Sequence, residues 1–251
     1  MSPGGTVWRV RHKAVTESTN KDALEGEPGD VFTAGLQTAG RGRLDHRWMS
    51  EPGKNLMMSA VVDVSGVPPD EVAALPLVVG LAVSDMVVDF FSGIGADEVA
   101  ASVKIKWPND ILVGGCKICG ILCERKGDRV IAGIGLNVNQ TQFPEEIDAM
   151  ATSLARAAGR ESGMSLDGVR DAVLKRLGDA LGRWRRDGFG SMWGEVVRRD
   201  FLKGKALSVL RTDSDTAPVE GLCGGIGPDG ALLVGGIPVY AGEAHVVPSC
   251  S

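Results

Sequence analysis

Hydrophobic and polar residues alternate along several stretches of the chain. Residues 7–15, 31–38 and 55–64 are rich in valine and partly alternating, and each is bounded by glycine, proline or polar clusters, which predicts β-strands. Residues 103–139 predict three or four further strands in quick succession, with a hairpin turn at Gly114-Gly115. The first part of the chain therefore builds a sheet.

Other stretches have apolar residues at helical spacing. Polar residues 17–20 are typical of a capped helix start and precede a short helix. Residues 70–91 predict the first long helix. Residues 165–186 predict another, with Ser165 as its N-cap, and a shorter helix follows over 192–200.

The composition changes after Leu202. Residues 203–242 are rich in glycine, with prolines and short valine or leucine runs, and Pro-Asp-Gly at 228–230 predicts a turn between strands. This favours a small all-β barrel. We predict two domains, 1–202 and 203–251, and because no Ser/Gly linker separates them we expect them to pack against each other.

Composition and charge exclude some classes of protein. The 251 residues are 43% hydrophobic and 24% charged, as in folded globular proteins. The 27 basic and 32 acidic residues give a net charge of −5, which disfavours a protein whose main task is to neutralise DNA or RNA. The apolar run 72–84 is too short to span a bilayer, and the start of the chain lacks the layout of a secretory signal, so we expect a cytoplasmic protein.

A glycine–arginine loop follows the second predicted strand. It reads QTAGRGR at 37–43, and Trp48 and PGKNL at 52–56 come next. Glycines let a backbone approach a ligand closely, while guanidinium groups form fixed forks for carboxylate or phosphate. The loop therefore predicts a small-anion site, with a solvated loop or an RNA-binding patch as alternatives.

A second motif, KWPND at 106–110, precedes Lys117 and the Gly-Ile-Leu of 120–122. Its charged and amide side chains stand among apolar residues, where strand alternation sends some of them inward. Burial of these groups is costly without an ionic partner. Exposed positions on a strand are the plain alternative, and it is strongest for Lys104.

These motifs, together with GIGLNVN at 133–139, resemble the biotin protein ligase family. They occur in the family's order and cover nearly the whole chain. The resemblance implies an α+β fold: a mixed β-sheet catalytic domain flanked by helices, of the class II synthetase-like biotin/lipoate ligase type, with a small C-terminal SH3-like β-barrel. It also implies a monofunctional ligase without an N-terminal DNA-binding domain, since the first strand begins too early for a helix-turn-helix.

The implied reaction has two steps. The biotin carboxylate attacks the α-phosphorus of ATP to give biotinoyl-5'-AMP and pyrophosphate, and a lysine of a biotin carboxyl carrier domain of an acyl-CoA carboxylase then takes the biotinoyl group. ATP with Mg²⁺ is the implied cofactor and biotin the substrate, with neither DNA nor a membrane as partner. Metal ligands, oligomeric state and the order of substrate binding stay open.

Motif matching assigns the site residues. Lys117 would bridge the carboxylate and the α-phosphate. Arg43 would hold the phosphates when its loop becomes ordered around the ligand. Asp110 would orient Lys117, assist Mg²⁺ or help deprotonate the acceptor lysine. The implied biotin-binding residues are Ser18, Thr19, Gln37, Gly40, Arg41 and Gly120. The implied nucleotide-binding residues are Arg43, Trp48, Lys106, Asn109 and Asn137.

Some of these residues also fit purely structural roles. Ser18 or Thr19 fits a helix cap, and Trp48 and Trp107 fit core or wall positions. The cysteines at 116, 119 and 123 suggest zinc, but one CxxC without a partner pair is weak support for it.

The sequence departs from the family pattern at two places. Asp45 and His46 follow the GRGR segment where the family often continues with Gly and Arg, so a second phosphate-binding cation is in doubt there. The stretch 20–30 is short and contains Gly26, Pro28 and Gly29, which predicts a stunted first helix.

Two other functions compete with biotin ligation. One is a lipoate or other acyl-carrier protein ligase of the same fold, disfavoured because the paired motifs resemble the biotin branch. The other is a nucleic-acid-binding or regulatory protein that uses the glycine–arginine loop, disfavoured by the net charge.

Overall fold

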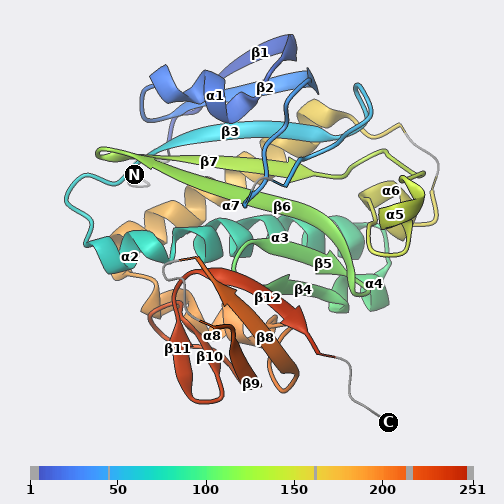
Figure 1. Ribbon diagram of the computed structural model, residues 1–251. Coiled ribbons are helices and arrows are strands. Elements are labelled where there is room, and N and C mark those ends of the chain that lie inside the picture. Colours follow the sequence, from blue (N-terminus) through green and yellow to red (C-terminus); the bar gives the residue numbers. More distant parts are fainter. Residues whose placement is uncertain (1–5, 45, 161–162, 213–216, 248–251) are drawn as a thin grey trace.

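The computed structural model describes residues 6–44, 46–160, 163–212 and 217–247, and within them seven strands form one mixed sheet in the order β1-β2-β3-β7-β6-β5-β4 (Figure 1). β1 and β2 are parallel, and the other neighbouring strands are antiparallel. The predicted strands are confirmed. Their bounds are β1 Arg9–Thr16, β2 Asp30–Gln37, β3 Leu56–Asp63, β4 Val103–Lys106, β5 Asp110–Val113, β6 Cys116–Lys126 and β7 Arg129–Leu136.

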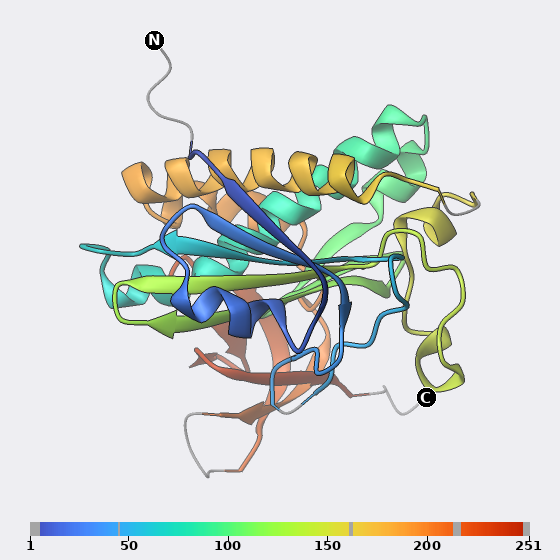
Figure 2. The same cartoon turned by 90° about the horizontal axis from the view of Figure 1, so that it is seen from above.

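Helices cover both faces of this sheet near its centre. Figure 2 shows α3 (Leu75–Gly93) and α7 (Leu166–Asp187) along one face, with α1 (Thr19–Asp22) on the other. β3 is therefore buried on both faces, which explains why its apolar residues do not alternate strictly. The first helix is as short as expected: α1 is followed at once by a 3₁₀ turn, Ala23–Glu25.

The prediction of one helix over 70–91 is wrong. The chain forms α2 (Pro69–Ala73) and then α3, with the break at Ala74. Pro76 explains the break, because proline lacks the N–H of a helix interior and is tolerated only in a first turn. By length and hydropathy α3 is apolar enough to cross a membrane. However, 67% of its most apolar 18-residue stretch is buried inside the protein, so α3 is a core helix.

Helix α7 follows the prediction closely, and Ser165 Oγ caps it by accepting a hydrogen bond from the Gly168 N–H. α8 (Gly190–Arg198) lies within two residues of the predicted range. Three short helices have no signal in the sequence pattern: α4 (Asp97–Ala101), α5 (Glu145–Asp148) and α6 (Leu154–Ala157). Each has only four or five residues, too few to show helical periodicity.

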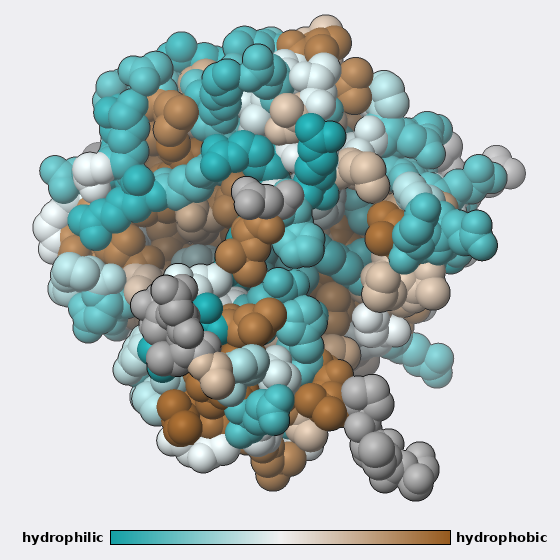
Figure 3. All heavy atoms as spheres, in the orientation of Figure 1, coloured by the Kyte–Doolittle hydropathy of each residue, from teal (hydrophilic) through white to brown (hydrophobic). Residues whose placement is uncertain are grey.

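A second, antiparallel sheet follows α8. Among the described residues its strands lie in the order β11-β10-β9-β8-β12, which confirms the α+β class with a small SH3-like β-barrel at the C-terminus. Exposed apolar side chains, among them Leu222 and Ile237, lie on this part, and Figure 3 shows hydrophobic surface over it. The bounds are β8 Ala206–Arg211, β9 Val219–Ile226, β10 Leu232–Val234, β11 Ile237–Val239 and β12 Gly242–Val246.

The two sheets share one hydrophobic core. Leu207, Val234 and other buried residues of the second sheet belong to the same cluster as the helices and the first sheet. Trp107 Nε1 donates to the Gly230 carbonyl at 3.0 Å, and Trp193 Nε1 donates to the Ile226 carbonyl at 2.8 Å. The predicted packing of the two parts is confirmed, while the domain boundary after residue 202 stays a prediction.

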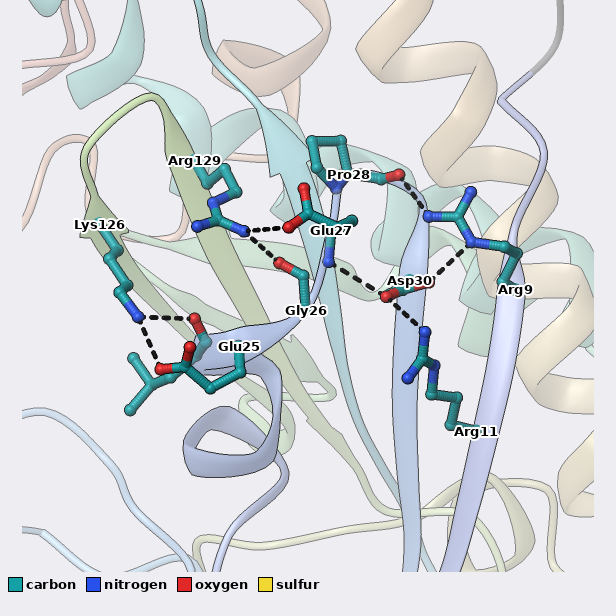
Figure 4. Close-up of polar contacts among 10 residues, drawn as sticks. Arg9, Arg11, Glu25, Gly26, Glu27, Pro28, Asp30, Lys126 and Arg129 are labelled. Atoms are coloured by element: carbon teal, nitrogen blue, oxygen red, sulfur yellow. Dashed lines mark hydrogen bonds and ion pairs between the residues drawn. The ribbon is translucent and has the colours of Figure 1, made fainter.

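A buried carboxylate fixes β1 to the edge of the sheet. Asp30, whose side chain is 1% exposed, accepts hydrogen bonds from Arg9 Nε at 2.8 Å and Arg11 Nη2 at 3.0 Å (Figure 4). The Glu27 N–H adds a third at 3.1 Å. Burial by itself raises the pKa of Asp30, but the Glu27 N–H and the two guanidinium groups outweigh it and hold the pKa below its ordinary 3.8.

We expect Asp30→Asn to lower the melting temperature by several degrees at neutral pH. A carboxylate with a lowered pKa stabilises the fold above its ordinary pKa, and the contribution is lost as the pH falls through the lower folded value. The variant should therefore approach wild type in strong acid. Thermal unfolding across acid pH checks this, with the exposed Asp167→Asn as control; a constant difference at every pH would contradict it.

Candidate functional site

A cavity of about 960 Å³ opens at one end of the first sheet. Its walls are the ends of β2, β5, β6 and β7, the glycine–arginine loop, the segment 142–151 and β12 of the second sheet. Of the site residues predicted from the sequence, all except Gly40 line it: Ser18, Thr19, Gln37, Arg41, Arg43, Trp48, Lys106, Asn109, Asp110, Lys117, Gly120 and Asn137. The fold thus brings motifs that are far apart in sequence to one place.

Lys117 and Asp110 form an ion pair in this cavity. Lys117 Nζ lies 2.8 Å from Asp110 Oδ1, and the two side chains are 40% and 18% exposed. The pairing is electrostatic, since Asp110 Oδ1 is a buried oxygen with no well-directed hydrogen bond among the described residues. The ammonium group also lies 6.0 Å from the centre of the Trp48 ring. The ionic partner expected for Lys117 is therefore present.

Two glycines form a flat floor under Trp48. Gly120 and Gly135 face each other on β6 and β7. A Cβ on Gly135 would lie 2.5 Å from the Trp48 ring, so that position leaves no room for a side chain, and one on Gly120 would be a tight contact at 3.2 Å from the ring. Gly40 supports the same tryptophan from the loop, because its carbonyl accepts the Trp48 N–H at 3.1 Å. Trp48 Nε1 is buried without a hydrogen-bond partner among the residues described.

Arg43 connects the loop to the second sheet. Its Nη1 donates to the Gly242 carbonyl at 3.1 Å and lies 3.5 Å from Asn109 Oδ1. Burial lowers the pKa of Arg43, and the carboxylates of Asp110 and Glu243 act in the opposite direction. A guanidinium stays charged under these conditions. The cavity therefore holds Arg43 and Lys117 as two cations that both interact with the Asp110 carboxylate.

The other end of the cavity is polar and uncharged. Thr19 N–H donates to Gln37 Oε1 at 2.7 Å, and the Thr19 hydroxyl lies 3.1 Å from the same oxygen. Ser18 stands at the N-cap position of α1, yet its side chain makes no capping hydrogen bond. The capping alternative is thus wrong for the Ser18 hydroxyl, which is buried at the cavity wall.

Several predicted residues point elsewhere or have further contacts. The Arg41 side chain pairs with Glu124 at 2.8 Å. Asn137 donates to the Thr152 carbonyl at 3.0 Å and is buried. His46 Nε2 lies 3.7 Å from a Glu243 carboxylate oxygen, while Asp45 is outside the described residues.

Three further residues contact the predicted site residues or line the cavity: Ser59, Glu124 and Glu243. Nothing in the sequence pattern singled out Ser59 or Glu243. Glu124 follows Gly-Ile-Leu-Cys directly on β6, and its place at the end of a recognised motif was the available signal.

The cysteines do not form a metal site in the described part of the chain, where no three His, Cys, Asp or Glu residues gather. Burial raises the pKa of the Cys119 thiol well above its ordinary value, so Cys119 is a protonated thiol near neutral pH.

A family model and several known proteins are similar in sequence to this chain. The Biotin/lipoate A/B protein ligase family model matches residues 6–140. The Bifunctional ligase/repressor BirA of Bacillus subtilis is 38% identical over 163 residues, 62% of this chain and 46% of that protein. The biotin (acetyl-CoA-carboxylase) ligase of Mycobacterium tuberculosis is 40% identical over 157 residues, 60% of this chain and 56% of that protein. The matched part of the chain spans about half the length of these two relatives.

Other relatives match over nearly their whole length. The biotin (acetyl-CoA-carboxylase) ligase of Paracoccus denitrificans is 32% identical over 236 residues, 89% of this chain and 92% of that protein. The solved structure of the biotin protein ligase of Aquifex aeolicus in complex with biotin and ATP superposes with a TM-score of 0.79 and 28% identity, over 96% of this chain and 99% of that one.

Proposed function

Because this chain belongs to the biotin/lipoate A/B protein ligase family, we propose that it activates biotin with ATP and transfers the biotinoyl group to a lysine of a carrier protein. The observation that carries this proposal is the Lys117–Asp110 pair beside Arg43 in one cavity. Joining a carboxylate to a phosphate brings two anions together, and fixed cations that stabilise the developing charge are usually the largest catalytic contribution.

In the first step, a biotin carboxylate oxygen attacks the α-phosphorus of ATP. A new P–O bond forms, the bond to the β-phosphate breaks, and pyrophosphate leaves. Lys117 is the cation that meets both the carboxylate and the α-phosphate, and Asp110 holds its ammonium group in place at 2.8 Å. Arg43 faces the phosphates from the loop.

The two ends of the cavity suit the two substrates. Thr19, Gln37 and Ser18 offer hydroxyl and amide groups for the ureido ring of biotin, with the backbones of Arg41 and Gly120 beside it. Gly40 does not line the cavity and acts through its hydrogen bond with the backbone of Trp48. Trp48, Lys106, Asn109 and Asn137 belong to the nucleotide side. These assignments rest on the family motifs and on the position of each residue in the cavity.

In the second step, the neutral amine of the carrier lysine attacks the acyl carbon of biotinoyl-AMP. An amide bond forms, AMP leaves, and the amine loses a proton. Lys117 and Arg43 again face the departing negative charge. The proton released by the amine passes to solvent, and the carboxylate of Asp110, which pairs with Lys117 at 2.8 Å, orients that ammonium group.

Mg²⁺ fits this site as an ion that arrives with ATP. In the chain segments that the structure describes, no cluster of three acidic, histidine or cysteine ligands forms a protein cage. Magnesium commonly needs only one or two carboxylates besides substrate phosphates, and the lining of the cavity includes the carboxylates of Glu51, Asp110 and Glu243. When bound, the ion neutralises charge on the phosphates.

The names of two relatives support a partner. Those from Mycobacterium tuberculosis and Paracoccus denitrificans are ligases for acetyl-CoA carboxylase, so the proposed partner is the biotin carboxyl carrier domain of an acyl-CoA carboxylase. The net charge of −5 disfavours DNA as a partner, and the proposed setting of the reaction is the cytoplasm. Residues 1–202 would carry the biotin and ATP site, and 203–251 would complete it from the side of Gly242.

Pyrophosphate release from ATP tests the proposal. We expect release that depends on biotin and exceeds by far the release with lipoate or octanoate. Preference for lipoate or octanoate would favour the alternative acyl-carrier ligase, and release with none of the three acids would contradict acid activation altogether.

A further inference from the structure

Glu124, near the end of β6, is a carboxylate at which two separate parts of the site meet. From the glycine–arginine loop, Arg41 Nη2 lies 2.8 Å from Glu124 Oε1 and Arg41 Nη1 donates to Oε2 at 3.2 Å. From α1, Asn20 Nδ2 donates to Oε2 at 2.7 Å. The Glu124 side chain is 27% exposed, whereas Asn20 is 4% exposed. One side of this junction is therefore at the surface and the other is buried.

The buried side continues to the polar end of the cavity. Asn20 Oδ1 accepts a hydrogen bond from the Ser59 hydroxyl at 2.6 Å, and Ser59 Oγ lies 2.7 Å from the Thr19 hydroxyl. Ser59 is fully buried in β3. Thr19 in turn holds Gln37 Oε1 through its N–H. Hydrogen bonds thus run without a gap from Glu124 to Gln37.

β7 leaves room for this chain of contacts. A Cβ on Gly133 would lie 2.1 Å from Asn20 Oδ1, so any side chain there would displace the amide. Asn20 Nδ2 also donates to the Leu122 carbonyl at 3.3 Å, which fixes the orientation of the amide. The Asn20 side chain is therefore held in one position, with its N–H groups toward β6.

We propose that Glu124 is a positioning residue that couples the glycine–arginine loop to the biotin-binding end of the cavity. Through Arg41 it holds the loop backbone over the cavity. Through Asn20 and Ser59 it fixes the hydroxyl of Thr19 and the amide of Gln37. The inference rests on the proposed function, since it assigns biotin to that end. Among the residues that the structure describes, Glu124 pairs with Arg41 and Asn20 and not with Lys117 or Asp110. Its role is therefore in binding and not in the chemical step.

Two substitutions distinguish the contact of Glu124 with Arg41 from its contact with Asn20. Glu124→Gln keeps an oxygen that accepts from Asn20 but removes the charge opposite Arg41. Glu124→Ala removes both contacts and leaves the Asn20 amide short of a buried partner. An exposed ion pair contributes little, while a buried hydrogen bond to a charged group contributes more. The alanine variant should therefore show the larger effect.

Steady-state pyrophosphate release at saturating ATP measures the effect on biotin. We expect Glu124→Ala to raise the KM for biotin by about tenfold or more, with kcat and the KM for ATP within about threefold of wild type. Glu124→Gln should raise the KM for biotin by a smaller factor. Glu25→Ala, which removes an exposed ion pair with Lys126 beside the same hairpin, should leave all three constants unchanged.

A ligand-free measurement keeps this inference separate from the proposed function. Hydrogen exchange of the unliganded protein should be faster over residues 38–48 and at Thr19 in Glu124→Ala than in wild type, whatever acid the enzyme uses. Faster exchange without any biotin-dependent activity in wild type would overturn the assignment of biotin but retain the coupling. An unchanged KM for biotin and unchanged exchange in a folded variant, or a fall in kcat alone, would overturn the coupling.

Discussion

Replacing Lys117 with alanine is expected to lower the rate of biotin-dependent pyrophosphate release by about 100-fold or more, because loss of one preorganised charge contact typically costs that much. The fold should survive, since the Lys117 side chain is 40% exposed and its main partner is the Asp110 carboxylate. Biotin binding should change far less than the rate, because the polar end of the cavity does not involve Lys117.

Single-turnover release of pyrophosphate at saturating biotin and ATP measures this effect. Lys104→Ala is a matched control, because Lys104 lies on β4, which β5 separates from the strand of Lys117, and is not part of the cavity wall. A correctly folded Lys117→Ala with near wild-type release would exclude Lys117 as the cation that bridges carboxylate and phosphate.

Arg43→Gly is expected to release the adenylate from the enzyme. Arg43 spans from the loop to the Gly242 carbonyl of the second sheet and to Asn109, so its loss opens the cavity on that side. Free biotinoyl-AMP acylates lysines at random. Biotin should therefore appear on a bystander protein such as serum albumin at least about tenfold faster than with wild type, by analogy with loops that retain reactive intermediates.

Blotting of the bystander protein for biotin checks this result. Arg47→Gly removes an exposed arginine that follows the glycine–arginine loop and also lines the cavity, so it serves as the control for lost charge and for added flexibility. Equal labelling by Arg43→Gly and Arg47→Gly would mean that the contact with Gly242 does not retain the adenylate.

Much of the fold follows from local sequence signals. The strands of the first sheet and the helix capped by Ser165 were predictable because their periodicity and end signals lie within a few residues of each other. Pro76 is a signal for the break in the helix predicted over 70–91. The apolar residues on both sides of it favoured one continuous helix instead. The short helices α5 and α6 depend on packing and carry no period of their own.

The site was predictable in its members and not in its contacts. Lys117, Asp110 and Arg43 could be predicted because each lies in or beside a short motif that resembles the family. The contact of Arg43 with Gly242 joins residues 199 positions apart, and that of Asn20 with Glu124 joins residues 104 positions apart. Such pairings depend on strand register and on the docking of the second sheet, which no local pattern encodes.

Arg41 illustrates the difference. The family motif assigns the backbone of Gly40 and Arg41 to biotin and leaves the direction of the Arg41 side chain open. In the structure the Arg41 guanidinium pairs with Glu124. The sequence predicts the residue type needed in the loop, but the direction of the side chain follows from a carboxylate on a strand that is distant in sequence.

A crystal structure of the protein with biotin and ATP would show whether this cavity activates biotin through Lys117. We expect electron density for biotinoyl-AMP in the cavity, with the ureido ring beside Thr19 and Gln37 and the acyl phosphate within hydrogen-bond distance of Lys117 Nζ. Density for biotin elsewhere on the protein, or an acyl phosphate that Lys117 does not reach, would contradict it.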